Sequence, residues 1–156
     1  MISPNYTQTD IIFLSGLFEG EGAMWIASEA SAYNPHINAH VAVTNNSLEL
    51  LLYLQDKFGG TVHTKRKIMG ENTHITHQWH LAWRDISTLL SAMLPYLITK
   101  KEVAKLVIEY RTTVTGKTGK LSQADRDKRE ELYKKYLHLV ELKKSNIIKI
   151  KRLPHG

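Results

Sequence analysis

The sequence predicts an α+β fold in which helices and pairs of strands follow the order αββαββα, with one extra helix at the C-terminal end. Residues 36–43 and 73–83 alternate apolar and polar side chains as half-buried strands do, and another strand-like segment precedes each of them. Apolar residues at helical spacing occur before, between and after these strand pairs. We therefore expect a four-stranded antiparallel sheet with one polar face.

The first helix is expected to begin near Thr9 or Asp10, either of which can cap it, and to end at Gly22. Gly16 and Gly20 lie four residues apart on one helix face. A second helix backbone can approach closely at such a face. The apolar residues at helical spacing are Ile12, Leu14, Leu17 and Phe18.

Two carboxylates, those of Glu19 and Glu21, lie near the end of this helix. A negative charge in the last turn opposes the helix dipole, a mismatch of about 0.3–1 kcal/mol, so a positive group is expected beside Glu21. A divalent cation is the economical choice, because Mg²⁺ prefers one or two carboxylates together with water and phosphate. The alternative is an ordinary surface helix whose two acids are solvated.

Each strand pair is expected to form a hairpin, with polar turns at residues 31–35 and 69–72. Between the hairpins, a leucine-rich helix over residues 47–58 ends at Gly59 and Gly60, which are a normal C-terminal signal. The four expected strands cover residues 23–29, 36–43, 61–68 and 73–83.

Two helices are expected after the second hairpin. Asp85 can cap a short helix that ends at Pro95, and another helix runs from about Lys100 to Arg111. Their apolar residues recur at helical spacing, which predicts one buried stripe on each helix. These residues are Ile86, Leu89, Leu90 and Met93 in the first helix, and Val103, Leu106, Val107 and Tyr110 in the second.

The chain is expected to divide into a core over residues 1–112 and a basic helical extension with a tail over residues 113–156. Ser122 and Asp125 form a capping box ahead of a basic amphipathic helix that reaches about Lys144, and a loose tail follows it. This helix either packs on the core or adds phosphate contacts through its lysines and arginines. The residues suited to packing are Leu132, Tyr136, Leu139 and Val140.

Length and composition limit the classes of protein to which this chain can belong. At 156 residues the chain is long enough to bury a core as one domain or as one domain with an extension. It has no cysteine, which excludes disulfides and zinc–thiolate sites. The apolar run at residues 11–18 is too short to span a bilayer. We expect no membrane partner and an intracellular protein, either in an organelle (chloroplast or mitochondrion) or in a prokaryotic cytoplasm.

The net charge of +6 is unevenly distributed along the chain. Residues 1–60 carry one lysine and six acids, a charge of −5, whereas residues 61–156 carry twenty lysines and arginines against nine acids, a charge of +11. Such a distribution suits a polyanion-binding protein whose metal site lies in the acidic part. The alternative is a set of solvated basic helices on a protein of another function.

Residues 14–22, which read Leu-Ser-Gly-Leu-Phe-Glu-Gly-Glu-Gly, resemble the motif of the LAGLIDADG homing endonucleases. Four residues match the consensus identically, glutamates replace its two aspartates, and Ser15 and Gly20 replace its alanines. The element order over residues 9–112 is also the one that this family has. The identical residues are Leu14, Gly16, Leu17 and Gly22.

The resemblance implies an intron-encoded, site-specific endonuclease that cuts double-stranded DNA with Mg²⁺ or Mn²⁺. Glu21 and the Gly20 carbonyl would bind the metal, Asn45 would hold a metal-bound or attacking water, and Lys100 would stabilise developing charge. A departure occurs at Glu49, where some relatives carry a basic residue. Because the motif occurs once, the resemblance also implies a homodimer that recognises a nearly palindromic site. Its interface residues would be Gly16, Leu17 and Gly20.

The polar face of the sheet is expected to read base edges in the major groove, which admits a two-stranded ribbon. Asparagine and glutamine suit adenine, lysine suits guanine, and histidine can donate or accept. A zinc site at His74, His77 and His80 is not expected, because strand alternation points His77 to the opposite face. The residues expected to contact DNA are Glu29, Ser31, Tyr33, Asn34, His36, Asn38, His40, His63, Lys65, Lys67, His74, Thr76, Gln78 and His80.

Two other functions compete with the endonuclease. The same fold could serve as a maturase that binds intron RNA for splicing, or as a DNA-binding protein that does not cleave. The two intact acids favour catalysis, because loss of Glu21 would mark an inactive enzyme. A structural protein that used its basic tail as an interaction arm would leave the polar sheet face unexplained.

Overall fold

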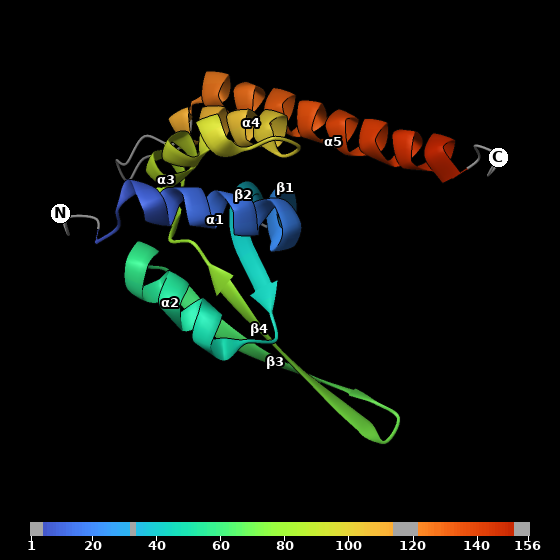
Figure 1. Ribbon diagram of the computed structural model, residues 1–156. Coiled ribbons are helices and arrows are strands. Elements are labelled where there is room, and N and C mark those ends of the chain that lie inside the picture. Colours follow the sequence, from blue (N-terminus) through green and yellow to red (C-terminus); the bar gives the residue numbers. More distant parts are fainter. Residues whose placement is uncertain (1–4, 32–33, 114–121, 152–156) are drawn as a thin grey trace.

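The computed structural model describes residues 5–31, 34–113 and 122–151 of the chain. Helices and paired strands alternate in the expected order, so the predicted fold class is confirmed (Figure 1). Short 3₁₀ segments, η1 and η2, flank α3. The elements are α1 (Gln8–Glu21), β1 (Gly22–Ser31), β2 (Asn34–Asn45), α2 (Leu48–Phe58), β3 (Thr61–Met69), β4 (Asn72–His80), η1 (Trp83–Asp85), α3 (Ile86–Met93), η2 (Leu94–Tyr96), α4 (Lys101–Thr112) and α5 (Gln123–Lys151).

The four strands form one antiparallel sheet in the order β1-β2-β4-β3. Each hairpin is paired along its whole length, but β2 and β4 pair only where residues 42–45 lie beside residues 77–80. The hairpins are therefore joined at their bases and diverge beyond them. In Figure 1 the β3–β4 hairpin projects far from the helices.

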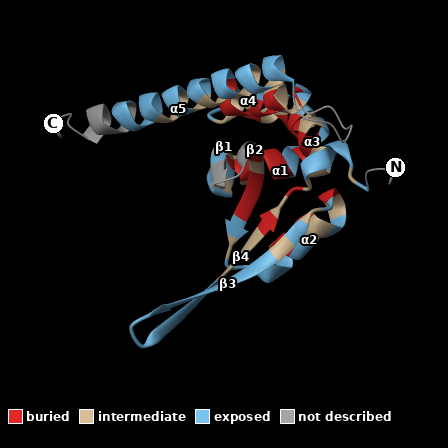
Figure 2. Ribbon diagram, turned by 180° about the vertical axis from the view of Figure 1, so that it is seen from behind, coloured by how far each residue is buried: buried red, intermediate tan, exposed pale blue. Residues whose placement is uncertain are grey.

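The hydrophobic core lies between the helices and one face of the sheet. On β1 and β2, Met24, Ile26, Val41 and Val43 are buried, as the alternating pattern predicts. The predicted stripes of α3 and α4 are also buried, apart from Leu106, which is partly buried. Figure 2 shows that burial is concentrated under the helices and is lost along the outer part of β3 and β4.

The long helix α5 packs along α4 and reaches β1 and β2. Leu132 is fully buried in the core, and Tyr136 and Leu139 pack against it. A salt bridge of 2.8 Å joins Lys128 of α5 to Glu109 of α4. The prediction that this helix packs on the core is therefore confirmed. The division of the chain at residue 112 stays a prediction.

Several element ends differ from the sequence predictions. Thr7, and not Thr9 or Asp10, caps α1, and Asp10 completes a capping box by accepting a hydrogen bond from the Thr7 backbone N–H. The fourth strand ends at His80, three residues early, because residues 83–85 form a 3₁₀ turn. Asp85 precedes α3 without a capping hydrogen bond from its side chain.

The C-terminal helix is longer than the sequence predicts, because α5 continues to Lys151 and not only to about Lys144. Residues 149–151 were expected in a loose tail, and residues 152–156 lie outside the described part. Among the described residues, no helix combines the length and the apolar character needed to cross a membrane.

Candidate functional site

Glu21 and Asn45 meet where α1 ends and β2 ends, as two members of the predicted catalytic set. The Asn45 amide Nδ2 donates a hydrogen bond to Glu21 Oε2. Its Oδ1 accepts from the Ser47 backbone N–H at 2.7 Å, in the turn before α2. Because the backbone fixes the amide oxygen, the amide nitrogen of Asn45 faces the carboxylate. Glu21 is exposed, so its carboxylate also meets solvent.

Gly22 lets the chain pass from α1 into β1 within one residue. Its backbone is extended, with φ −82° and ψ 153°, so the expected glycine end of the helix is present without a left-handed conformation. A Cβ at this position would lie 2.3 Å from the ring of Phe18. Only glycine allows the strand to start directly over this buried ring, and the sharp junction leaves Glu21 at the corner.

Glu19, the other acid of the motif, binds the segment of residues 98–100 that precedes α4. Its carboxylate accepts from the backbone N–H groups of Ile98 at 2.5 Å and Thr99 at 3.1 Å, and from the Thr99 hydroxyl. Partial burial raises the pKa of Glu19, but these hydrogen bonds outweigh it and hold the pKa below the ordinary value. Glu19 therefore does not point into solvent.

Lys100 lies on the other side of the same contact. Its Nζ donates to the carbonyl oxygens of Phe18 and Gly22, which bracket Glu21 along the chain. Burial lowers the pKa of Lys100, opposed by the nearby Glu19 carboxylate. A lysine thus supplies the positive group that the C-terminal end of α1 was expected to need. The predicted catalytic role of Lys100 stays a prediction.

The corner formed by Glu21 and Asn45 offers one exposed carboxylate, a donor that suits a hard cation. Among the described residues, no three histidine, cysteine, aspartate or glutamate side chains are grouped to hold an ion. Mg²⁺ does not need such a cage, since it is commonly held by one or two carboxylates with water and phosphate. Glu21 offers one exposed carboxylate, which suits this kind of site. The predicted role of the Gly20 carbonyl stays a prediction.

The polar face of the sheet gathers most residues that were predicted to contact DNA. Directly paired residues of antiparallel strands lie on one face, as do alternate residues along each strand. His77 lies on the opposite face and contacts Thr64 at 2.9 Å, so the three histidines of β4 do not converge. The predicted DNA contacts that share the polar face are Asn38, His40, His63, Lys65, Lys67, His74, Thr76, Gln78 and His80.

The remaining predicted DNA contacts belong to the β1–β2 turn region. The backbone register pairs Glu29 with His36 and Ser31 with Asn34. The side chains of these four residues lie outside the described set, and Tyr33 lies outside the described residues altogether. Their contacts with DNA stay predictions.

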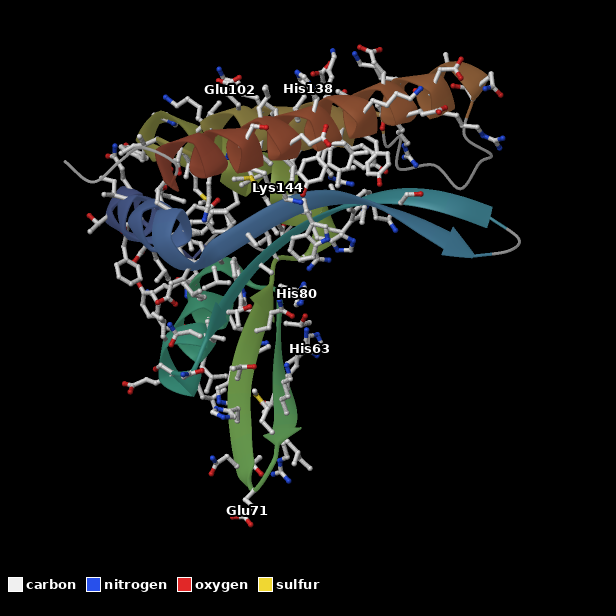
Figure 3. All side chains as sticks on the ribbon, turned by 90° about the vertical axis from the view of Figure 1, so that its right-hand side faces the viewer. His63, Glu71, His80, Glu102, His138 and Lys144 are labelled. Carbon is white, nitrogen blue, oxygen red and sulfur yellow. The ribbon has the colours of Figure 1, made fainter. Side chains whose placement is uncertain are left out.

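An aromatic row, formed by Trp25, His40, His80 and His63, crosses the polar face from β1 to β3. Trp25 stacks on His40 with ring centroids 5.0 Å apart and meets His80 edge-on at 6.5 Å, and His80 lies 5.7 Å from His63. Figure 3 shows His63 and His80 pointing to the same side of their hairpin. Sequence reasoning missed Trp25 as a site residue, although alternation with the buried Met24 and Ile26 places it on this face.

The surroundings of His80 disfavour its charged form. Burial lowers the pKa of His80, and His63, His40 and Lys65 lower it further by charge repulsion. Farther out, β3 is almost entirely exposed, with Ile68 at 73% of its full exposure. The polar surface therefore changes from a packed aromatic row at the base to an open basic ribbon at the tip.

The motif helix has a second apolar face that the described part of the chain leaves uncovered. Ile12, expected in the apolar stripe, is 48% exposed, and Phe13 is 46% exposed. A Cβ added at Gly16 or Gly20 would meet nothing within 4 Å. Leu17, the third predicted interface residue, is partly buried against the core. Beside this face, an open groove of about 440 Å³ is lined by Phe13, Ser47, Glu49, Leu50 and Tyr53.

Comparison with solved structures shows which fold this is. The homing endonuclease I-CvuI, in complex with its target in the presence of calcium, matches with TM-score 0.63 and 19% identity over 85% of this chain and 82% of that chain. The archaeal intron-encoded homing endonuclease I-Vdi141I, complexed with DNA, matches with TM-score 0.66 and 14% identity over 84% of each chain.

A third structure, of the LAGLIDADG homing endonuclease I-GzeII in complex with a DNA target, has TM-score 0.62 and 17% identity and is matched over 42% of its length, against 78% of this chain. No protein-family model and no curated protein sequence matches the chain. The chain therefore has the LAGLIDADG homing endonuclease fold, which confirms the fold that the motif predicted.

Proposed function

We propose that this chain is a site-specific, intron-encoded endonuclease that cuts double-stranded DNA as a homodimer with Mg²⁺ or Mn²⁺. The observation that carries the proposal is the corner at Glu21 and Asn45, in a fold whose solved examples include complexes with DNA targets. The polar sheet face, with its row of histidines and lysines, supports DNA as the partner. The exposed basic hairpin of β3 and β4 is a two-stranded ribbon, an element that the major groove admits.

A homodimer would cover the free face of α1. Gly16 and Gly20 leave room for a second α1 backbone, and the exposed Ile12 and Phe13 would gain apolar contacts there. The two Glu21 residues would then approach each other at the end of both helices. A two-fold assembly would present the same sheet to two half-sites, so the proposed target is nearly palindromic, with one phosphodiester cut in each strand.

Different residues of this chain would have different roles in hydrolysis. Glu21 would hold the cation, and Asn45, fixed by Ser47, would orient the carboxylate and the attacking water. Bound Mg²⁺ supplies charge stabilisation at the phosphate and acidifies water. The sheet would position the duplex through base and phosphate contacts so that one bond on each strand reaches a Glu21.

The proposal is tested with the full chain, a randomised pool of duplexes and Mg²⁺. We expect selective cleavage of a nearly palindromic sequence. Glu21→Gln should keep DNA affinity and lose cleavage, because it removes the anionic ligand but keeps the side-chain shape. Asn45→Ala should slow cleavage by about 10–100-fold, as is typical when a group that orients a metal ligand is removed.

Two variants serve as controls, because they alter the same chemical groups away from the corner. Glu102→Gln changes an exposed acid on α4, and Asn46→Ala changes the exposed neighbour of Asn45. Both should cut like the parent chain. Equal cutting by Glu21→Gln and the parent would contradict the role of Glu21. Tight binding of intron RNA without any cut DNA would instead favour the maturase.

A further inference from the structure

The carboxylate of Glu19 is fully occupied within its own chain. Its Oε1 accepts from the backbone N–H groups of Ile98, Thr99 and Lys100 at 2.5, 3.1 and 3.4 Å. Its Oε2 accepts from the Thr99 hydroxyl and, at 3.2 Å, from the Thr99 N–H. These contacts use four donor hydrogens, because the single Thr99 N–H is shared by both oxygens. A carboxylate has about four lone-pair sites, so none is left free for a metal ion.

We propose that Glu19 is a positioning residue and not a metal ligand: it holds residues 98–100 against α1 and thereby places Lys100 on the carbonyls that bracket Glu21. The role in cleavage rests on the proposed function, whereas the contact itself does not. We call the contacts of Glu19 with residues 98–100, together with the two Lys100 bonds to α1, the helix-end clamp. The two acids of the motif then have different roles, although they lie two residues apart.

The helix-end clamp places one charged side chain at the end of α1 and another at the start of α4. Lys100 is the N-cap of α4, so Glu19 places a negative charge at the N-terminal end of α4. Lys100 places a positive charge at the C-terminal end of α1. Both placements are favourable with respect to the helix dipoles. Successive backbone N–H groups that point at one anion also form a concave site for it. The end of α1, which has no basic residue in its own last turn, thus receives a positive charge, and the start of α4 receives a negative charge in addition to that of Glu102.

The clamp constrains Glu21 from both sides along the chain. Lys100 Nζ bonds to the carbonyl of Phe18, three residues before Glu21, and to that of Gly22, immediately after it. The backbone that carries Glu21 is thus fixed relative to α4. From α5, Lys143 Nζ donates to the Thr99 carbonyl at 3.1 Å, so the C-terminal helix supports the same segment.

The inference is tested on the full chain with Glu19→Gln, Lys100→Met and the double variant. Amide hydrogen exchange should accelerate at least about tenfold at Ile98, Thr99 and Lys100 in Glu19→Gln, because a neutral amide cannot accept all these bonds. Single-turnover cleavage of bound DNA should fall about 10–100-fold, with DNA affinity within about twofold of the parent. Because Glu19 and Lys100 act through one contact, the double variant should be no slower than the slower single variant.

Two further variants calibrate the result. Thr99→Val removes only the hydroxyl bond to Glu19 and keeps the backbone donors, so its effects should have the same sign but be smaller. Glu102→Gln changes an acid in the first turn of α4 outside the clamp and should match the parent in exchange and rate.

Unchanged amide exchange at residues 98–100 in Glu19→Gln would overturn the inference. If cleavage were also lost completely in that variant, Glu19 would instead behave as a direct metal ligand. If the parent chain cut no DNA at all, the proposed function would fail, while the exchange measurement would still decide whether the clamp exists.

Discussion

At the scale of single residues, Asn45 contributes to the candidate site without adding charge to it. Its amide donates to the Glu21 carboxylate, so this carboxylate has a neutral hydrogen-bond partner. A second acid at this position would bring two negative groups together and oppose the ionised state of Glu21. The neutral amide of Asn45 therefore leaves the Glu21 carboxylate able to bind a cation.

His80 gives a pH-dependent prediction at the same scale. Its pKa is lowered from 6.5 because burial, and the charges of His63, His40 and Lys65, disfavour its protonated form. Below pH 6.5 the unfolded chain therefore binds more protons at this position than the folded chain does. The free energy of unfolding is therefore higher while His80 is neutral, above pH 6.5. This contribution is lost as the pH falls through the pKa that His80 has in the folded chain.

We expect the free energy of unfolding to fall between about pH 7.5 and about pH 5.5, and to fall less in His80→Gln. Urea unfolding at both pH values measures the difference. Gln78→Ala changes a non-titrating neighbour on the same strand face and should keep the pH dependence of the parent. An equal loss in His80→Gln and the parent would show that His80 does not contribute.

At the scale of elements, the sheet and α5 differ in how firmly they are held. The outer part of the β3–β4 hairpin has little buried surface on either face, whereas its base is anchored by the buried Trp79. The Trp79 indole N–H donates to the Gly59 carbonyl at 2.7 Å, which ties the end of α2 to β4. The outer part of the hairpin is therefore held less firmly than its base.

The buried Leu132 predicts that α5 is part of the folded core and not a detached arm. Leu132 is 0% exposed. Leu132→Ala should lower the free energy of unfolding by about 2–5 kcal/mol through lost burial and a cavity. On the same helix, Leu137 is 45% exposed, and Leu137→Ala should cost about 0.5 kcal/mol or less. Urea unfolding compares the two, and equal small costs would mean that α5 is held loosely.

At the scale of the whole molecule, the free face of α1 predicts the assembly. The monomer gives Gly16 no steric reason to be glycine, since a Cβ there would meet nothing within 4 Å. Gly16→Leu should keep the fold, and its better helix propensity adds up to about 0.8 kcal/mol of stability. The bulky side chain should nevertheless prevent a second α1 from approaching and so abolish the dimer.

Sedimentation of the free and DNA-bound protein tests this prediction. The parent should sediment as a dimer, at least on DNA, and Gly16→Leu as a monomer with unchanged circular dichroism. Ser91→Leu adds the same side chain at an exposed position of α3 and should stay dimeric. A dimer that survived Gly16→Leu would place the interface elsewhere.

The sequence by itself determined the elements, their order, the motif and the polar face of the sheet. Periods of two and 3.6 residues record which side of a strand or helix is buried, so Val41, Leu90 and Tyr110 could be placed in the core from local pattern. Local signals were weaker at element ends: the cap at Thr7 depends on reciprocal bonds with Asp10, and the α5 end depends on continued helical hydrogen bonding.

Only the tertiary structure decided what the two motif acids touch. Glu19 meets residues 79–81 positions away, and Asn45 reaches Glu21 across 24 positions. Such contacts produce no periodic pattern in the sequence, because they depend on how two helix ends and a strand end come together after the core has packed. For the same reason, the sequence favoured a divalent cation as the positive group near the C-terminal end of α1, whereas the structure places the Lys100 ammonium group there.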